Sequence, residues 1–492
     1  MEKKIRFRNH ISVILEQLGA AFGILLVLFI TNIDDLLDYI EGGTAEELST
    51  TAFIGGMILF TVLVCSLLYQ WIVWAKTYIS ICDNSIVIER NTINKKKNTI
   101  GIKNISNVNT EQNLLEMLLG TCKVKLDTNT MSTSDKTDVK IVLKKADAEQ
   151  FRFYVMKLLQ GENAEREEKT EEEENAWSIQ TDFADIFIHG LFSINLLSIF
   201  VVLGCLVAVV GMVAQVVGSV KAGESIGQML VSFLMLIIVL GSAIWDIMKG
   251  FIRYYDFKIK RNDEKLYIRY GVLKKVNYTI PIETISALKI KQTFFARLTG
   301  RFMAEIVNIG MGDDASETEA FFLPYCKKGK MEERIRLLLP EFSEALQMET
   351  KRQPKRVWIA WIWPIFLFAV FLVTGTITSI VYSPEFQTEI LWGVSAFCVL
   401  TMFFLAAHYL TAGVSVGDDY MAIANGYFGR VFCYISYRDI QYLEFSQNIF
   451  ANCVKLQKGG VHLLAASANR EQTIPYISME EGEKIKEKIL IR

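Results

Sequence analysis

The chain has 492 residues, of which 51% are hydrophobic and 22% are charged, and its formal net charge is −2. This length is too great for one ordinary domain, and the near-neutral charge excludes a global field that would draw the chain to nucleic acid. Because apolar and charged residues occur in separate blocks, the composition is typical of an integral membrane protein.

Six windows free of Asp, Glu, Lys and Arg are long enough to cross a hydrocarbon core about 30 Å thick, the first only just. No convincing cleavage site follows the first window, so we expect an uncleaved helix there rather than a signal peptide. The windows fall in three close pairs, which predicts three helical hairpins. The expected membrane helices lie at about 17–33, 51–75, 186–211, 226–248, 357–382 and 389–411.

A long polar block follows each expected hairpin. The linker after the first block is rich in Glu, and such a run repels itself and stays solvated. The linker after the second block is shorter and mixed in charge. We expect hairpins at 1–75, 181–250 and 357–411, polar domains at 76–160, 251–340 and 412–492, and linkers at 161–180 and 341–356.

Tryptophan and charge indicate how the chain is oriented. All eight Trp residues lie at or near the ends of expected helices, and indole prefers the membrane–water boundary. Basic residues cluster before the first and fifth helices and after the second and fourth. The loop between the first two helices has six acidic residues and no base. By the positive-inside rule, both termini and all three polar blocks are expected in the cytoplasm.

The three polar blocks repeat one short pattern, in which two Ile residues stand five positions apart. A Gln follows twelve positions after the first Ile, and a base precedes that Ile by five. In the first two blocks a Gly comes eight positions after the Gln. In chain order these residues are Lys95, Ile100, Gln112 and Gly120, then Lys275, Ile280, Gln292 and Gly300, then Arg430, Ile435 and Gln447. Such repetition predicts three copies of one structural unit.

Within each block, apolar and polar residues alternate as they do in β-strands, and the last segment has the period of an amphipathic helix. In the first block the strand pattern begins at 79–82 and 85–89, and Phe151, Val155 and Leu158 share one helix face. We therefore expect each unit to comprise two membrane helices, a β sandwich or barrel, and a C-terminal helix.

The pattern Ile280-Pro-Ile-Glu-Thr-Ile285 with Gln292 and Gly300 resembles the bacterial pleckstrin-homology-like (PH-like) domain. Two helices followed by this domain, three times over, are similar to the YdbT-like membrane proteins of Gram-positive bacteria across nearly the whole chain. The resemblance implies a membrane α + β fold, with six transmembrane helices in three hairpins, each followed by a PH-like domain. It also implies a bacterial cell-membrane location and a membrane protein partner that carries a related domain.

Two sets of repeated residues are candidate sites. Bases near a β turn could contact anionic lipid, at about 1 kcal/mol per base, or a partner, or could protect an edge strand from pairing. These bases are Lys95, Lys96, Lys97, Lys274, Lys275 and Arg430. The second set is expected to be structural, since a Gln can bond backbone groups at a strand-to-helix corner. This set is Gln112, Gly120, Pro281, Gln292, Gly300 and Gln447.

The chain has no G-x-S-x-G, HExxH or glycine-rich phosphate-binding motif, and its eight cysteines are scattered singly without a CxxC. We therefore expect no enzyme activity, no cofactor and no metal site. The sequence favours a multi-pass scaffold or adaptor that binds a partner protein or the lipids of the inner membrane surface. Envelope stress or protection against membrane-active compounds is its expected setting. The alternative is a subunit or accessory of a transporter or exporter.

Overall fold

The computed structural model of the protein describes eleven stretches of the chain, and every statement below concerns them. They are residues 5–14, 50–82, 85–92, 94–128, 139–160, 177–194, 196–219, 226–262, 264–308, 320–463 and 471–490. The expected first membrane helix at 17–33 and the glutamate run of the first linker lie outside the described residues.

The first unit has a long helix, followed by two groups of antiparallel strands and a closing helix. The strand–helix alternation follows the sequence periodicity, and the closing helix buries Phe151 and Val155 against the sheets. Its elements are β1 (Ile5–Phe7), α3 (Thr50–Ala75), β2 (Thr77–Cys82), β3 (Ser85–Asn91), β4 (Lys95–Gly101), β5 (Ile105–Asn113), α4 (Leu114–Leu118), β6 (Thr121–Thr128), β7 (Val139–Lys144) and α5 (Lys145–Gln160).

The second unit repeats this order, with three helices before its sheets. Met331, Ile335 and Leu338 form the buried face of its closing helix. Its elements are β8 (Ile179–Gln180), α7 (Phe183–Ser193), α8 (Leu196–Ser219), α9 (Ile226–Arg253), β9 (Lys258–Asn262), β10 (Lys265–Tyr270), β11 (Lys274–Pro281), β12 (Ile285–Gln292), α10 (Phe294–Leu298), β13 (Arg301–Asn308), β14 (Ala320–Lys327) and α11 (Lys328–Leu338).

The third unit has the same plan and ends with a helix whose Ile485 is fully buried. Its elements are β15 (Lys351–Arg352), α12 (Val357–Ala360), α13 (Ile362–Tyr382), α14 (Gln387–Thr411), β16 (Gly413–Val416), β17 (Tyr420–Asn425), β18 (Arg430–Ser436), β19 (Ile440–Ser446), α15 (Ile449–Cys453), β20 (Leu456–Leu463), β21 (Glu471–Ser478) and α16 (Met479–Leu490).

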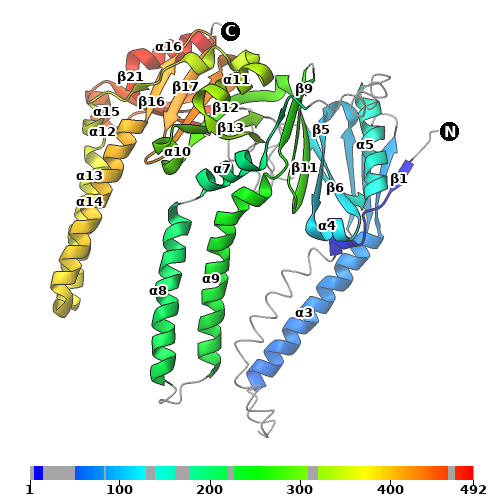
Figure 1. The fold of residues 1–492 in the computed structure, drawn as a ribbon, viewed down its shortest axis with the longest axis horizontal. Coiled ribbons are helices and arrows are strands. Elements are labelled where there is room, and N and C mark those ends of the chain that lie inside the picture. The colour runs from blue at the N-terminus through cyan, green and yellow to red at the C-terminus, as the bar shows by residue number, and fades with distance from the viewer. Residues whose placement is uncertain are drawn as a thin grey trace.

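The strands of neighbouring domains join into common sheets. One seven-stranded sheet has the order β7-β6-β5-β11-β10-β9-β8, and a second has the order β14-β13-β12-β18-β17-β16-β15. Each therefore combines the second half of one domain with the first half of the next. The sheets β1-β2-β3-β4 and β19-β20-β21 form the two ends. The three domains consequently stand in a row, with the first and third at its ends (Figure 1).

A short strand precedes the helices of each unit and pairs with the first strand that follows them. Ile5 lies opposite Ile81, Ile179 opposite Ile259, and Lys351 opposite Val414. Sequence periodicity did not indicate these strands, because two or three residues are too few to show alternation. The chain thus leaves and re-enters the same sheet around each helical segment.

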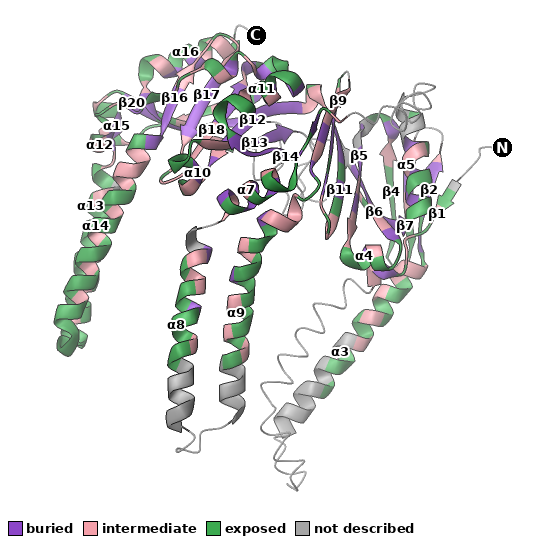
Figure 2. Cartoon of the chain, in the orientation of Figure 1, coloured by how far each residue is buried: buried purple, intermediate pink, exposed green. Residues whose placement is uncertain are grey.

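The long helices extend from one side of the row (Figure 1). Three described helical stretches are long and apolar enough to cross a membrane: Phe233–Arg253, Ile365–Tyr382 and Pro384–Thr411. A fourth crossing exists if Phe183–Ser193 and Ser198–Gly211, which meet at a 72° bend, form one span. In Figure 2 most of the described residues of these long helices are exposed or intermediate, whereas the sheets hold the buried residues.

The break between α7 and α8 falls inside the helix expected over 186–211. Helix α7 turns away from α8 because its apolar face packs on the second domain, where Ile186, His189 and Phe192 are buried. Gly190 allows α7 to approach α9 closely, since a Cβ there would overlap the ring of Phe251 on α9. The backbone of Ile194 is extended and ends α7.

The hydrophobic cores show how firmly the domains are joined. The core of the first domain contains its own residues only. The second and third domains exchange core residues: Ala422 and Tyr434 belong to the second domain's cluster, and Ala287 and Val307 to the third's. Each fully buried Ile or Leu at such a contact contributes about 1.5–3 kcal/mol.

Candidate functional site at the domain junctions

The repeated glutamines close the same corner in all three domains. The side-chain Nε2 of each donates to a backbone carbonyl nine residues ahead, at the start of the next strand. The acceptors are Thr121 O at 2.8 Å from Gln112, Arg301 O at 3.0 Å from Gln292, and Leu456 O at 3.1 Å from Gln447. Each bond therefore holds the end of one strand to the beginning of the next, across the short helix between them.

The repeated glycines end those short helices. Gly120 and Gly300 both have φ of +63°, the left-handed conformation that commonly terminates a helix. The third domain keeps this geometry at Lys455, with φ of +55°, although the side chain there makes it unfavourable. Pro281 ends β11 with φ of −63°, which suits its ring.

The repeated base and the repeated Gln meet at the junctions between domains. Lys275 on β11 lies directly opposite Gln112 on β5, and Arg430 on β18 lies directly opposite Gln292 on β12. The base of one domain thus faces the Gln of the domain before it. The sequence repeat marks both residues but does not pair them, because their contact joins different copies.

The junction between the first two domains is polar and short. Four residue pairs join β5 to β11, from Lys274–Asn113 to Asn277–Thr110. At its centre the Glu111 carboxylate, with 4% of its side chain exposed, lies 2.6 Å from the Lys125 ammonium and 3.2 Å from that of Lys274. Two cations thereby compensate a charge whose burial alone would be costly.

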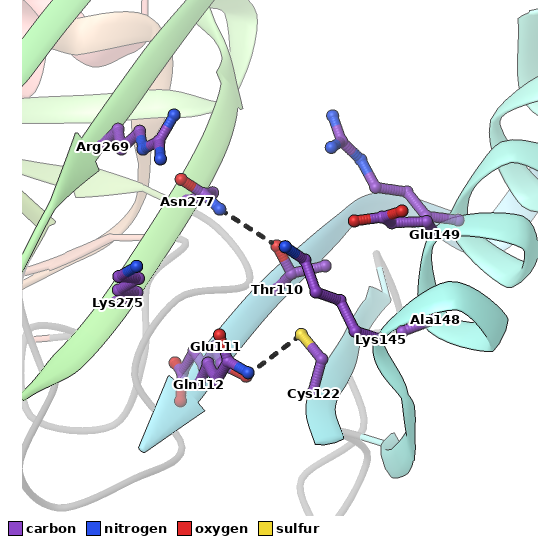
Figure 3. Close-up of a pocket in the computed structure, with 11 residues that line it drawn as sticks. Thr110, Glu111, Gln112, Cys122, Lys145, Ala148, Glu149, Arg269, Lys275 and Asn277 are labelled. Atoms are coloured by element: carbon purple, nitrogen blue, oxygen red, sulfur yellow. Dashed lines mark hydrogen bonds between the residues drawn. The ribbon is translucent and has the colours of Figure 1, made fainter. Parts of the chain in front are cut away.

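A cavity of about 260 Å³ opens at this junction, between β5, α5 and the second domain. Figure 3 shows side chains from both domains lining it, with Asn277 Nδ2 3.5 Å from Thr110 Oγ1. Burial and the nearby Glu116 carboxylate raise the pKa of the Cys122 thiol in its wall to about 11. The thiol is therefore protonated at neutral pH and is a poor nucleophile.

The junction between the second and third domains is apolar and longer. Six pairs join β12 to β18, and Leu288, Ile290 and Ile435 are buried within them. The linker at 341–356 also contacts both of these domains, through Glu341. Glu341 accepts two bonds from the Arg261 guanidinium, at 2.8 and 3.0 Å, and the carbonyl of Glu341 accepts a bond from the Tyr420 hydroxyl at 2.8 Å.

The ends of these strands lie beside the membrane helices. Arg430 donates to Leu410 O in the last turn of α14, at 2.9 Å. In the first domain, Asn91 lies opposite Lys95. The N–H of Asn91 donates to the carbonyl of Lys76, the residue that follows α3. The repeated bases Lys95 and Arg430 therefore stand at the membrane side of the row.

The short helices α4, α10 and α15 carry exposed apolar side chains. Thr293, which caps α10, donates to Phe192 O at 2.6 Å, and Asn448, which caps α15, donates to Ala360 O at 2.8 Å. These bonds place α10 and α15 beside the ends of membrane-side helices, and Figure 1 shows α4 and α10 on the side from which the long helices extend. The exposed residues are Leu115, Leu118, Leu298 and Ile449.

The predicted basic residues do not form one patch. Lys95, Lys96 and Lys97 lie exposed on β4, at an end of the row, whereas Lys274, Lys275 and Arg430 lie on strands that pair with the preceding domain. Among the described residues no three His, Cys, Asp or Glu side chains gather as metal ligands would.

Comparison with known proteins identifies the same three repeated domains. A family model described as Bacterial PH domain matches residues 22–159, 196–339 and 357–491. The chain is also similar to the UPF0699 transmembrane protein YdbT of Bacillus subtilis (strain 168), with 22% identity over 455 residues, which cover 88% of this chain and 89% of that protein. No solved structure matches the chain. The chain therefore belongs to the bacterial PH domain family and is a YdbT-like membrane protein that carries this domain three times.

Proposed function

We propose that the protein is a multi-pass scaffold in the bacterial cell membrane. Its row of PH-like domains lies against the inner membrane surface and binds a membrane protein that carries a related domain. The observation that carries this proposal is the pair of continuous sheets, because they make three domains one extended platform. Envelope stress and defence against membrane-active compounds are the proposed setting for such a platform.

The topology proposed here has three hairpins, with both termini and all three domains in the cytoplasm. The short strand before each helical segment and the first strand after it pair in one sheet, which favours an even number of crossings between them. The basic residues that flank the helices support the cytoplasmic side for the sheets.

Contact with the lipid surface is proposed for α4, α10 and α15 and the nearby strand ends. Leu115 and Leu118 on α4 point their apolar side chains away from the fold, and a base near an anionic lipid surface adds about 1 kcal/mol. A cavity of about 320 Å³ also lies between α9 and the second domain, with Lys249 and Arg253 in its wall. These features support binding to phospholipid head groups along this side.

A transport role would need a polar path through helices gathered around a common axis. In the part of the chain that the structure describes, α13 and α14 stand apart from α8 and α9 (Figure 1). The window Ile365–Tyr382 has no buried residue. These features give the transport alternative no support, and nothing in the described residues suggests catalysis.

A depth measurement tests the membrane contact. Bimane is attached at Leu118→Cys or, as the control, at Leu490→Cys, in full-length protein with the exposed Cys65 and Cys453 replaced by Ser. Both leucines are similarly exposed, 83% and 85%, but Leu490 ends α16 on the far side of the row. In vesicles of brominated phospholipid, quenching is expected at position 118 only. Equal quenching at both positions, or none at 118, contradicts the proposal.

A further inference from the structure

Each domain has two complementary edges. The last strand of its first sheet is β4, β11 or β18, and the first strand of its second sheet is β5, β12 or β19. Within the chain β11 pairs with β5 and β18 pairs with β12. In the described part of the chain β4 and β19 have a neighbour on one side only. The row therefore ends in one edge of each kind.

We propose that β19 of one copy pairs with β4 of a second copy, so that the protein assembles head to tail through continuous sheets. The inference rests on the proposed partner-binding role and names the partner. The chain itself is a membrane protein with the related domain, and the required edge is present at its other end. Strand addition at a sheet edge is a common mode of protein recognition.

The internal junctions predict the register of this contact. Lys275 opposite Gln112 and Arg430 opposite Gln292 define the rule, in which the base of one domain faces the Gln of the domain before it. Applied to the free edges, the rule places Lys95 of the second copy opposite Gln447. Continuing along both strands, Lys96 faces Ser446 and Ile100 faces Tyr442.

Residues on β19 are exposed at positions where the equivalent residues on β12 are covered by the next domain. On β12 the equivalent residues Ala287, Leu288 and Ile290 are buried by the third domain. On β19, Tyr442 is 54% exposed, and Leu443 and Phe445 are half-buried. On β4 the residues from Lys95 to Thr99 are all exposed. A second copy would cover both edges.

The charges of the two edges are also complementary. Lys96 lies opposite Arg90 within the first sheet, so two cations stand side by side at this edge. In the predicted register Glu444 lies diagonally across from Lys96. This is the geometry in which Glu111 lies 3.2 Å from Lys274 at the first junction. At the first junction a lysine thus contacts an acid diagonally across the paired strand, so lysines on β4 do not by themselves mark a protected edge.

The geometry of the row allows repeated addition. The sheets that hold the two free edges are the end sheets of the row, and the long helices extend from one side of it (Figures 1 and 2). A second copy that continues the row directs its helices toward the same membrane. Because the contact joins two different surfaces, it generates a ring or an open row rather than a closed two-fold dimer.

Disulfide trapping in native membranes tests the register. Two differently tagged full-length chains, one with Lys96→Cys and one with Ser446→Cys, are co-expressed and oxidised with copper phenanthroline. We expect an interchain disulfide that neither variant forms alone. Lys96→Cys with Tyr442→Cys, four residues out of register on the same face, should react about tenfold less, since a disulfide needs Cα atoms about 4.4–6.8 Å apart. Equal yields, or none, overturn the proposal.

A charge exchange tests the contact without cysteines. Glu444→Lys in both tagged chains should reduce their co-purification about fivefold, and adding Lys96→Glu to both should restore it. Glu333→Lys, an exposed site on α11 of the second domain, serves as the matched control and should have no effect. If Ser446→Cys crosslinks only to a different protein with a PH-like domain, the second-copy inference fails while the scaffold proposal stands. If bimane at position 118 is not quenched, the proposed membrane contact fails, and the pairing of two copies is not affected.

Discussion

Replacing Glu111 by Gln should loosen the first junction without unfolding the domains. The change removes the negative charge 2.6 Å from the largely buried Lys125 ammonium and 3.2 Å from that of Lys274. Breaking a buried ion pair costs about 3–5 kcal/mol when one partner is left uncompensated. Gln keeps a hydrogen-bonding oxygen, and Lys274 is partly exposed. We therefore expect the free energy needed to open the first junction to fall by about 2 kcal/mol, near a 30-fold change in the opening equilibrium.

Hydrogen exchange measured by mass spectrometry resolves this effect by region. Peptides from β5 and β11 should exchange about 30-fold faster in Glu111→Gln, because opening of this junction exposes their shared hydrogen bonds. Peptides from β12 and β18 should keep their rates, since that junction rests on Leu288 and Ile290. Unchanged exchange in β5 and β11, or equal acceleration at both junctions, would refute the assignment of Glu111 to the first junction.

Three further predictions concern single residues of the domains. Lys455→Gly should stabilise the third domain by about 1 kcal/mol and Gly300→Ala should destabilise the second by a similar amount, because both positions are left-handed; chemical denaturation of the full chain checks this. Burial raises the pKa of Asp439 from 3.8 to about 6, so the folded state binds its proton more tightly and loses stability as pH rises through this range. Asp439→Asn should therefore raise the free energy of unfolding at pH 7.5 by about 1 kcal/mol after allowance for solvent screening, seen as a higher thermal midpoint, with little gain at pH 4. Iodoacetamide at pH 7.5 should modify the exposed Cys453 well before Cys122, whose pKa is near 11; equal rates by mass spectrometry would contradict the environment described for Cys122.

The repeated domain could be predicted from sequence because its signal is local and occurs three times. The Ile–Ile pattern and the following Gln recur at fixed spacing, and the family match confirms three bacterial PH domains in a membrane protein. The structural role of each Gln could also be predicted, because its hydrogen bond closes a strand-to-helix corner within its own domain. Gln292, for example, reaches the carbonyl of Arg301 nine residues ahead.

The junctions could not be predicted in this way. Lys275 and Gln112 are far apart in sequence and belong to different copies, so no periodicity relates them. The strand at Ile179–Gln180 is too short to show alternation, and the bend after Ser193 depends on packing of α7 against the second domain. Both features arise from tertiary contacts, which override local preference.

The central claim is that neighbouring domains share continuous sheets, and one pair of cysteines tests it most directly. Thr110 and Asn277 lie opposite each other on β5 and β11, in different domains of one chain. Thr110→Cys with Asn277→Cys should form an intrachain disulfide in native membranes under mild oxidation, and Thr110→Cys with Lys275→Cys, two residues out of register, should form far less. No disulfide in the first variant, or equal yields in both, would contradict the shared sheet.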